Sequence, residues 1–204
     1  MYGTLGIVVD RLPAMRSLVV IAMLLANSQA GACALSLVAP AHSSLENPVK
    51  VTAAVTDETL TARFAVATPS LNAKAVLTTG EYPYQFDIVE LFVTFSDSGF
   101  PYFEFEVSPY NQTFQVRIVS AKEHHEGVDL GLISTAEIVG DGWNAVLKIP
   151  LKPLGWDGDL AKIRGNFYST LEKSPRSYWS TFLPKSTKPN FHQPQFFKPL
   201  LQCH

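Results

Sequence analysis

The amino-acid sequence predicts an all-β protein, an antiparallel β-sandwich whose two sheets pack face to face in a jelly-roll or immunoglobulin-like arrangement. Short runs of alternating apolar and polar residues, separated by turn residues, fill most of the chain, which is the pattern of a sandwich. No segment shows a convincing helical period. Hydrophobic residues make up 47% of the sequence, enough for a core. Residues 35–204, about 170 in number, fit a single domain.

The predicted strands follow one another along the chain between residues 49 and 169. Their β-branched and aromatic residues favour a pleated surface, and the intervening Asp, Ser, Thr and Gly residues favour turns. We expect strands at residues 49–55, 60–66, 87–95, 102–107, 114–118, 136–139, 143–149 and 163–169. The proline- and aromatic-rich tail, residues 173–201, predicts irregular chain that wraps the sandwich and contains one late strand.

The segment 102–107 shows the clearest alternation in the chain. One face carries Tyr102, Glu104 and Glu106, and the other carries only apolar residues. Arg117 is expected opposite a glutamate of this strand. Carboxylates, an arginine and aromatic rings on one sheet face suit a sugar, because hydroxyl groups bond to charged planar groups and C–H faces pack on rings. The alternative is a solvated face with ordinary cross-strand pairs.

Residues 1–34 predict a signal peptide, in which Met15 is a candidate for the true start. Arg16 supplies the positive charge, residues 18–26 form an unbroken apolar core, and residues 30–32 are the small residues before a cleavage site. The apolar run is about half of the ~20 residues that cross a bilayer as a helix. We therefore expect a bacterial protein that is periplasmic, associated with the outer membrane or secreted.

Cys33 lies in this cleavage region, and three roles stay open for it. Residues 30–33 resemble a bacterial lipobox, which would make Cys33 a lipidated N-terminus. Cys33 can instead pair with Cys203, the only other cysteine, in an oxidising compartment. The third alternative is that neither cysteine has a role. Membrane contact is expected only through the signal peptide or such a lipid anchor.

Charge and motifs exclude several classes of function. Removing residues 1–34 takes Arg11, Arg16 and Asp10 from the 16 Lys/Arg and 18 Asp/Glu, which leaves 14 and 17 and a net charge of −3. That charge gives no attraction for nucleic acid. The sequence has no glycine-rich phosphate loop, nucleophile elbow or zinc-protease motif.

Two kinds of segment carry residues that can ligate a metal ion. The Glu-His-His-Glu segment 123–126 predicts a charged loop, because adjacent histidines of an extended chain point in different directions. The turns at 141–142 and 157–159 can lend oxygens to calcium but lack the spacing of a dedicated loop. No cofactor is predicted, and structural calcium stays open.

A series of segments in fixed order carries a family resemblance. They are residues 87–93, 102–109, 142–143 leading into 149–151, 164–168, 178–180, 190–194 and 196–197, and the series spans about residues 45–201. In these segments the sequence resembles the family 9 carbohydrate-binding modules and their DOMON-like relatives. The resemblance implies an antiparallel sandwich of about ten strands that binds a sugar end between two aromatic rings, with structural calcium in some members.

The resemblance also implies which residues bind a sugar. The candidates by position are Tyr84, Glu90, Arg117, Asn166 and Trp179. Tyr82 is the alternative to Tyr84 as the first ring. Trp179 is the candidate for the second ring, since Ser169 falls near where that ring is expected.

Three functions are consistent with the sequence. The first is an exported, noncatalytic domain that binds an unspecified glycan. The second is an envelope interaction or structural domain of the same fold without a sugar site. The third is a glycoside-active enzyme that uses Glu104 and Glu106. Haem ligation by methionine, found among DOMON relatives, is excluded because Met1, Met15 and Met23 all precede residue 35.

Overall fold

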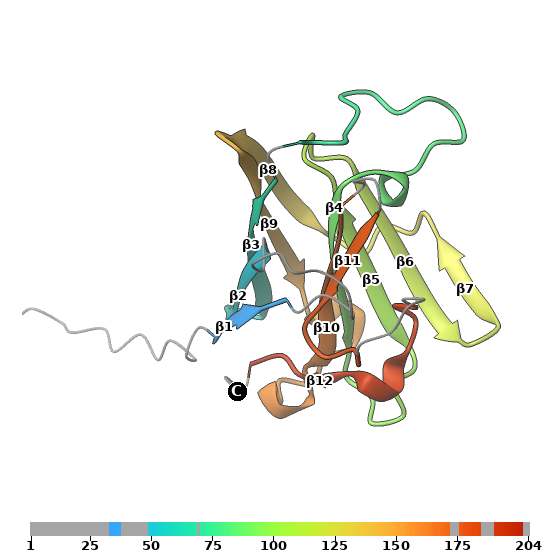
Figure 1. The fold of residues 1–204 in the computed structure, drawn as a ribbon. Helices are drawn as coiled ribbons and strands as arrows, with labels where there is room; N and C mark the ends of the chain where they lie inside the picture. Colours follow the sequence, from blue (N-terminus) through green and yellow to red (C-terminus); the bar gives the residue numbers. More distant parts are fainter. Residues whose placement is uncertain (1–32, 38–48, 69, 172–175, 185–189, 202–204) are drawn as a thin grey trace, which may run out of the picture.

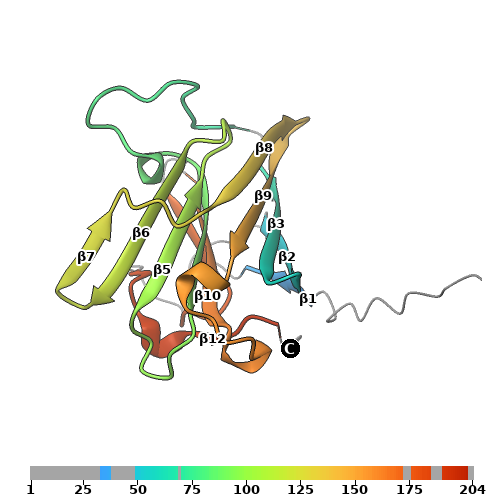
Figure 2. The same ribbon diagram turned by 180° about the vertical axis from the view of Figure 1, so that it is seen from behind.

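Two antiparallel sheets make up the protein, as the sequence predicted. The computed structural model describes residues 33–37, 49–68, 70–171, 176–184 and 190–201. The first sheet contains, in spatial order, β1 (Cys33–Ser36), β2 (Val49–Thr56), β3 (Thr59–Ala67), β9 (Gly142–Pro150) and β8 (Ile133–Val139). Both views show this sheet on one side of the molecule and the second sheet on the other (Figure 1, Figure 2).

The second sheet is the larger one and positions the site described below. Its order is β11 (Ser177–Ser180), β10 (Arg164–Leu171), β4 (Ile88–Thr94), β5 (Tyr102–Val107), β6 (Thr113–Ser120) and β7 (Glu123–Glu126), with β12 (Lys198–Pro199) also paired to β10. Within the described residues, four short 3-10 helices join the strands: η1 (Pro83–Gln85), η2 (Lys152–Leu154), η3 (Leu160–Lys162) and η4 (Pro194–Phe196). The described part of the chain contains no helix long and apolar enough to cross a membrane.

The two sheets differ in how they are buried. In β2 and β3 the buried and accessible residues alternate, so the first sheet faces the core on one side and solvent on the other. In β4 and β5 every residue is buried. The central strands of the second sheet are therefore covered on both faces, by the core on the inside and by irregular chain on the outside, whereas β6 is partly exposed and β7 is fully exposed.

The core between the sheets follows the period-two pattern of the sequence. Phe64 of β3 contacts Phe167 of β10 edge to face at 5.9 Å between ring centroids, which joins the two layers. A smaller cluster lies on the outer face of the second sheet, where Phe92 stacks on Tyr102 at 5.6 Å and meets Tyr168 at 4.8 Å. This second cluster supports the covering chain.

Two details of the second sheet correct the sequence prediction. Residues 123–126 form an edge strand, β7, which pairs with β6 instead of forming a loop. Arg117 stands opposite Phe103 of β5, whereas Glu104 stands opposite Val116. Because alternate residues point to opposite faces of a strand, Arg117 lies on the other face from the glutamates.

The N-terminal predictions lie largely outside the described residues. Residues 1–32 of the predicted signal peptide, which spans residues 1–34, lie outside the described part, and so does Cys203. Cys33 begins β1, where its backbone pairs with Ala53 of β2. Its side chain is not among the described ones, so the choice between lipid anchor, disulfide and no role stays open.

Candidate functional site

A pocket of about 730 Å³ opens on the outer face of the second sheet. Its floor is formed by β4, β5 and β6, and its walls by the loop that carries η1, the start of β11 and residues 190–192. Figure 1 shows the loop between β3 and β4, in teal, passing beside this sheet. The residues that matter for its chemistry are Tyr84, Glu90, Tyr102, Glu104, Glu106, Phe114, His124, Glu126, Arg176, Tyr178, Phe191 and His192.

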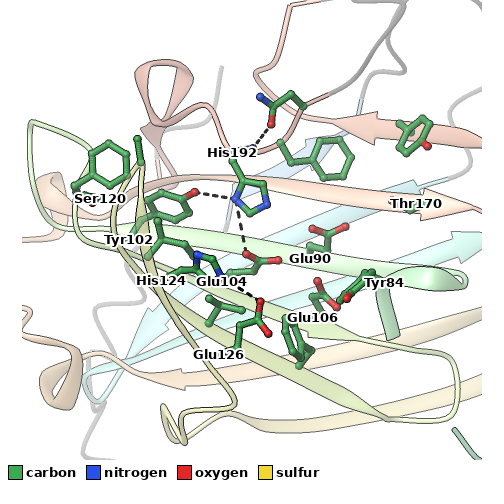
Figure 3. Close-up of a pocket in the computed structure, with 18 of the residues that line it drawn as sticks. Tyr84, Glu90, Tyr102, Glu104, Glu106, Ser120, His124, Glu126, Thr170 and His192 are labelled. Atoms are coloured by element: carbon green, nitrogen blue, oxygen red, sulfur yellow. Dashed lines mark hydrogen bonds and ion pairs between the residues drawn. The ribbon is translucent and has the colours of Figure 1, made fainter. Parts of the chain in front are cut away.

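Strand register brings three carboxyl groups together on the floor. Glu90 of β4 stands directly opposite Glu106 of β5, and Glu104 follows two residues along the same face. One carboxyl oxygen of each residue lies within 4.8 Å of the other two. Figure 3 shows the three groups gathered in the pocket. We call these residues the carboxyl cluster.

Burial makes the carboxyl cluster hold protons. Glu90 and Glu104 are each 5% exposed and Glu106 is 1% exposed. Loss of hydration raises the pKa of Glu104 to about 7, and the charge of Glu126 adds to this effect. Burial, followed by the charges of neighbouring glutamates, raises the pKa values of Glu90 and Glu106 well above their usual range. The cluster therefore keeps part of its protons at neutral pH.

Arg176 is the cation of this pocket. Its positive charge opposes the rise in pKa of Glu90 and Glu106. The guanidinium group donates a hydrogen bond to the backbone oxygen of Tyr84 and lies 5.2 Å from the centroid of the Tyr178 ring. Arg176 thus connects the two walls of the pocket.

His192 lies at the rim, above Glu104. Its Nδ1 atom is 2.8 Å from the Tyr102 hydroxyl oxygen and 4.0 Å from a carboxyl oxygen of Glu104 (Figure 3). Desolvation of the ring, followed by the nearby His124, lowers the pKa of His192 below its usual value. His192 is therefore predominantly neutral at pH 7 and serves as a hydrogen-bonding group there.

Aromatic rings form the two walls. Tyr84 stacks on Tyr82 at 5.1 Å with an interplanar angle of 7°, and both rings meet the edge of Phe114 at 5.6 Å. On the other side, Phe191 stacks on Tyr168 at 4.3 Å. Tyr84 keeps 39% of its surface exposed, which leaves ring area for a ligand.

Of the five sugar-binding candidates, the structure brings two into this pocket. Tyr84 and Glu90 line it, and Arg117 does not, because its strand register turns it to the other face. Trp179 is 2% exposed within the core between the sheets, where its indole N–H donates to the Ser177 hydroxyl. Alternation along β11 instead gives the pocket Tyr178, the preceding residue.

Asn166 is on the pocket-facing side of β10 but has a structural role. It is fully buried, and its Oδ1 atom accepts hydrogen bonds from the backbone N–H groups of Thr181 and Phe182 and from the Ser180 hydroxyl. These bonds fasten the chain after β11 to the sheet, so Asn166 lies beneath covering chain instead of lining the pocket.

Of the pocket residues named above, three that lie outside the strands were not among the sequence candidates. They are Arg176, His192 and Phe191. All three belong to segments that cross the outer face of the sheet. These segments are far along the sequence from the strands that they contact. The aromatic character of the tail, including Phe191, was a usable signal, whereas the position of Arg176 has no local signature.

The two aspartates of the turn at 157–159 contact nearby groups of the chain, and calcium binding there stays a prediction. Asp157 forms an ion pair with Lys162 at 2.5 Å. The Asp159 side chain accepts a hydrogen bond from the backbone N–H of Ala161 at the start of η3. Both carboxylates are therefore engaged by nearby groups of the chain.

Comparison with known proteins identifies the fold. No protein-family model matches the chain, and no curated protein matches it. Among solved structures, a candidate carbohydrate-binding protein from Bacteroides uniformis shares 20% sequence identity, with a TM-score of 0.67, over 82% of this chain and 84% of that one.

Two further solved structures give the fold its class. A family 9 carbohydrate-binding module from Caldicellulosiruptor kristjanssonii in complex with cellotriose has 17% identity and a TM-score of 0.52 over 83% of this chain and 80% of that one. A family 9 module from the same organism in complex with glucose has 16% identity and a TM-score of 0.51 over 82% and 81%. The chain thus has a fold like that of family 9 modules, as the sequence resemblance implied.

Proposed function

We propose that this chain is an exported, noncatalytic carbohydrate-binding domain that takes a sugar into the pocket on the outer face of its second sheet. The observation that carries the proposal is the combination of a buried carboxyl floor and aromatic walls in one cavity of about 730 Å³. That volume lies within the range of about 300–1,000 Å³ of ligand pockets.

The chemistry of the pocket suits a sugar ring. Carboxyl groups that hold part of their protons both donate and accept hydrogen bonds, which matches the mixed character of sugar hydroxyls. The exposed face of Tyr84 offers an apolar surface for the C–H face of a pyranose. Structural neighbours that were solved with cellotriose and with glucose support the same ligand class.

The arrangement of the acids favours binding over hydrolysis. A glycosidase places two carboxyl groups on either side of the scissile bond, about 5 Å or more apart. Glu104 and Glu106 instead share one face of one strand, on the floor of the pocket. We expect no release of nitrophenol from chromogenic glycosides; release that is lost in Glu104→Gln would favour the enzyme.

Replacement of Tyr84 is expected to weaken sugar binding by about tenfold or more, because a stacked ring contributes on the order of 1 kcal/mol beyond its buried area. The measurement is titration calorimetry with a ligand first found on a glycan array. Tyr110→Ala is the matched control, because Tyr110 is 44% exposed and does not line the pocket. Equal weakening by both variants would contradict a role for Tyr84, and an array without any bound glycan would favour an envelope interaction domain.

The export proposal rests on the signal-like residues 1–34 and has its own test. We expect the protein from its native membrane or periplasm to begin at or near Cys33 instead of Met1. Mass spectrometry of the N-terminal peptide distinguishes a diacylglyceryl-modified Cys33 from an unmodified cleaved end. A mature protein that still carries residues 15–30 would contradict export by this signal.

A further inference from the structure

We propose that the pocket selects a sugar that carries a primary ammonium group, an amino sugar without an N-acetyl group. This inference rests on the proposed carbohydrate binding and names the ligand class for that same pocket. It is carried by the geometry of the carboxyl cluster, by an unsatisfied acceptor within it and by the balance of charge around it.

The cluster is compact enough for its three carboxyl groups to surround one ammonium group. A primary ammonium has three N–H groups in tetrahedral directions. With donor–acceptor distances of about 2.8 Å, the three accepting oxygens stand about 4.6 Å apart. One oxygen each from Glu90, Glu104 and Glu106 lies within 4.8 Å of the others, and all three face the same cavity (Figure 3). A sugar hydroxyl, with a single O–H, can donate to only one of them.

Glu106, whose side chain also forms a hydrogen bond with Glu104, has one carboxyl oxygen that the described chain leaves unpaired. Its Oε2 atom is buried and has no hydrogen-bond partner among the described residues, and the side chain is 1% exposed. Buried polar atoms are nearly always paired, so an unpaired oxygen at the floor of a pocket indicates a donor that arrives with a ligand.

Charge around the cluster also favours a cationic ligand. The titratable groups that face it are Glu126 and His124 of β7, Tyr102 of β5, Tyr168 of β10, Tyr84 of η1, His192 at the rim and Arg176 before β11. Among the described residues, four carboxyl groups thus meet one permanent cation, Arg176. Without a ligand, bound protons reduce the repulsion among the carboxyl groups of the cluster. A bound ammonium group would reduce the same repulsion in their place.

Binding of an ammonium therefore releases protons from the cluster. Affinity for an amino sugar is expected to rise between pH 5 and pH 7, since protonated carboxyl groups must ionise to receive the cation. The ligand stays charged in this window, because an amine resembling an α-amino group titrates near pH 7.7. Glucose lacks the charge, so its affinity is expected to vary less over the same window.

Titration calorimetry with glucosamine, N-acetylglucosamine and glucose tests the proposal. At pH 7 we expect glucosamine to bind about tenfold more tightly than either neutral sugar, because hydrogen bonds to charged groups are stronger than neutral ones. Glu106→Gln is expected to remove this preference, since a neutral amide then replaces one of the three carboxyl groups that would receive the cation. Glu123→Gln is the control, because Glu123 is exposed and does not line the pocket.

The outcomes separate this inference from the proposed function. Binding of glucose at least as tight as that of glucosamine would overturn the amino-sugar inference and leave sugar binding intact. If none of the three sugars binds and no glycan on the array binds, both the amino-sugar inference and the proposed carbohydrate binding are overturned. Calcium chloride that binds alone with a Glu106-dependent signal, and that excludes glucosamine, would make the cluster a metal site and overturn the inference.

Discussion

The folded protein is expected to lose stability as the pH rises from 5 to 8. Glu90, Glu104 and Glu106 have pKa values above the ordinary value, so the folded state binds more protons than the unfolded chain in this window. Stability then falls with rising pH and levels off above the folded pKa values. Glu104 alone, with its pKa raised to about 7, contributes roughly 3 kcal/mol to this loss.

Urea unfolding at pH 5, 6, 7 and 8 measures this slope. His192 opposes it weakly, because a histidine whose folded pKa is lowered adds stability as the pH rises toward its ordinary value. Glu81 and Asp157 titrate below the window, since their pKa values are lowered by Lys74 and Lys162. A stability that stays level or rises from pH 5 to pH 8 would contradict the prediction.

The variant Glu106→Gln isolates the cluster as the cause. Removing this charge relieves the repulsion on Glu90 and Glu104, so the variant is expected to be more stable than the parent at pH 8 by about 1 kcal/mol or more, with a flatter pH dependence. Glu123→Gln, at an exposed position of β7, is expected to leave the curve unchanged. Destabilisation by Glu106→Gln at pH 8 would show that the charged form is needed for the fold.

Local alternation was sufficient to predict most of the strands and, in the clearest of them, the partition of the faces. In residues 102–107 it separated Phe103 and Phe105, which enter the core, from Glu104 and Glu106. It could not show that the polar face is buried. That burial comes from chain near Tyr84 and from residues 190–192, and a contact between segments so far apart in sequence leaves no local pattern.

Register explains why other parts of the site were not predictable. Arg117 has the right residue type and strand, yet a shift of one position along β6 decides which face it occupies. Trp179 and Tyr178 are adjacent in β11, so only one of them can face the pocket. Residue type alone favoured Trp179, because it has the larger ring for stacking on a sugar. The choice depends on the pairing of Trp179 with Ser169 of β10, a core-facing position, which the isolated segment does not specify.

Gly165→Ala is expected to destabilise the protein by at least about 3 kcal/mol, more than most single substitutions. Gly165 of β10 pairs with Val93 of β4, and a Cβ atom added there would lie 1.8 Å from the backbone oxygen of Phe92. The obstacle is backbone, so no side-chain rotation can relieve it. The strands must separate, and the ladder that holds Tyr168 opposite Glu90 beneath the pocket must shift with them.

Urea unfolding of Gly165→Ala beside Gly80→Ala separates this clash from the general cost of replacing glycine. Gly80 has a φ of +86° and no atom within 4 Å of the added Cβ, so its substitution is expected to cost only about 1 kcal/mol through backbone strain. Similar losses in the two variants would contradict the close approach of β10 to β4. The close approach of β10 to β4 sets the spacing of Glu90 and Tyr168. The fraction of Gly165→Ala that still folds should therefore bind sugar more weakly than the parent, whereas Gly80→Ala should bind it normally.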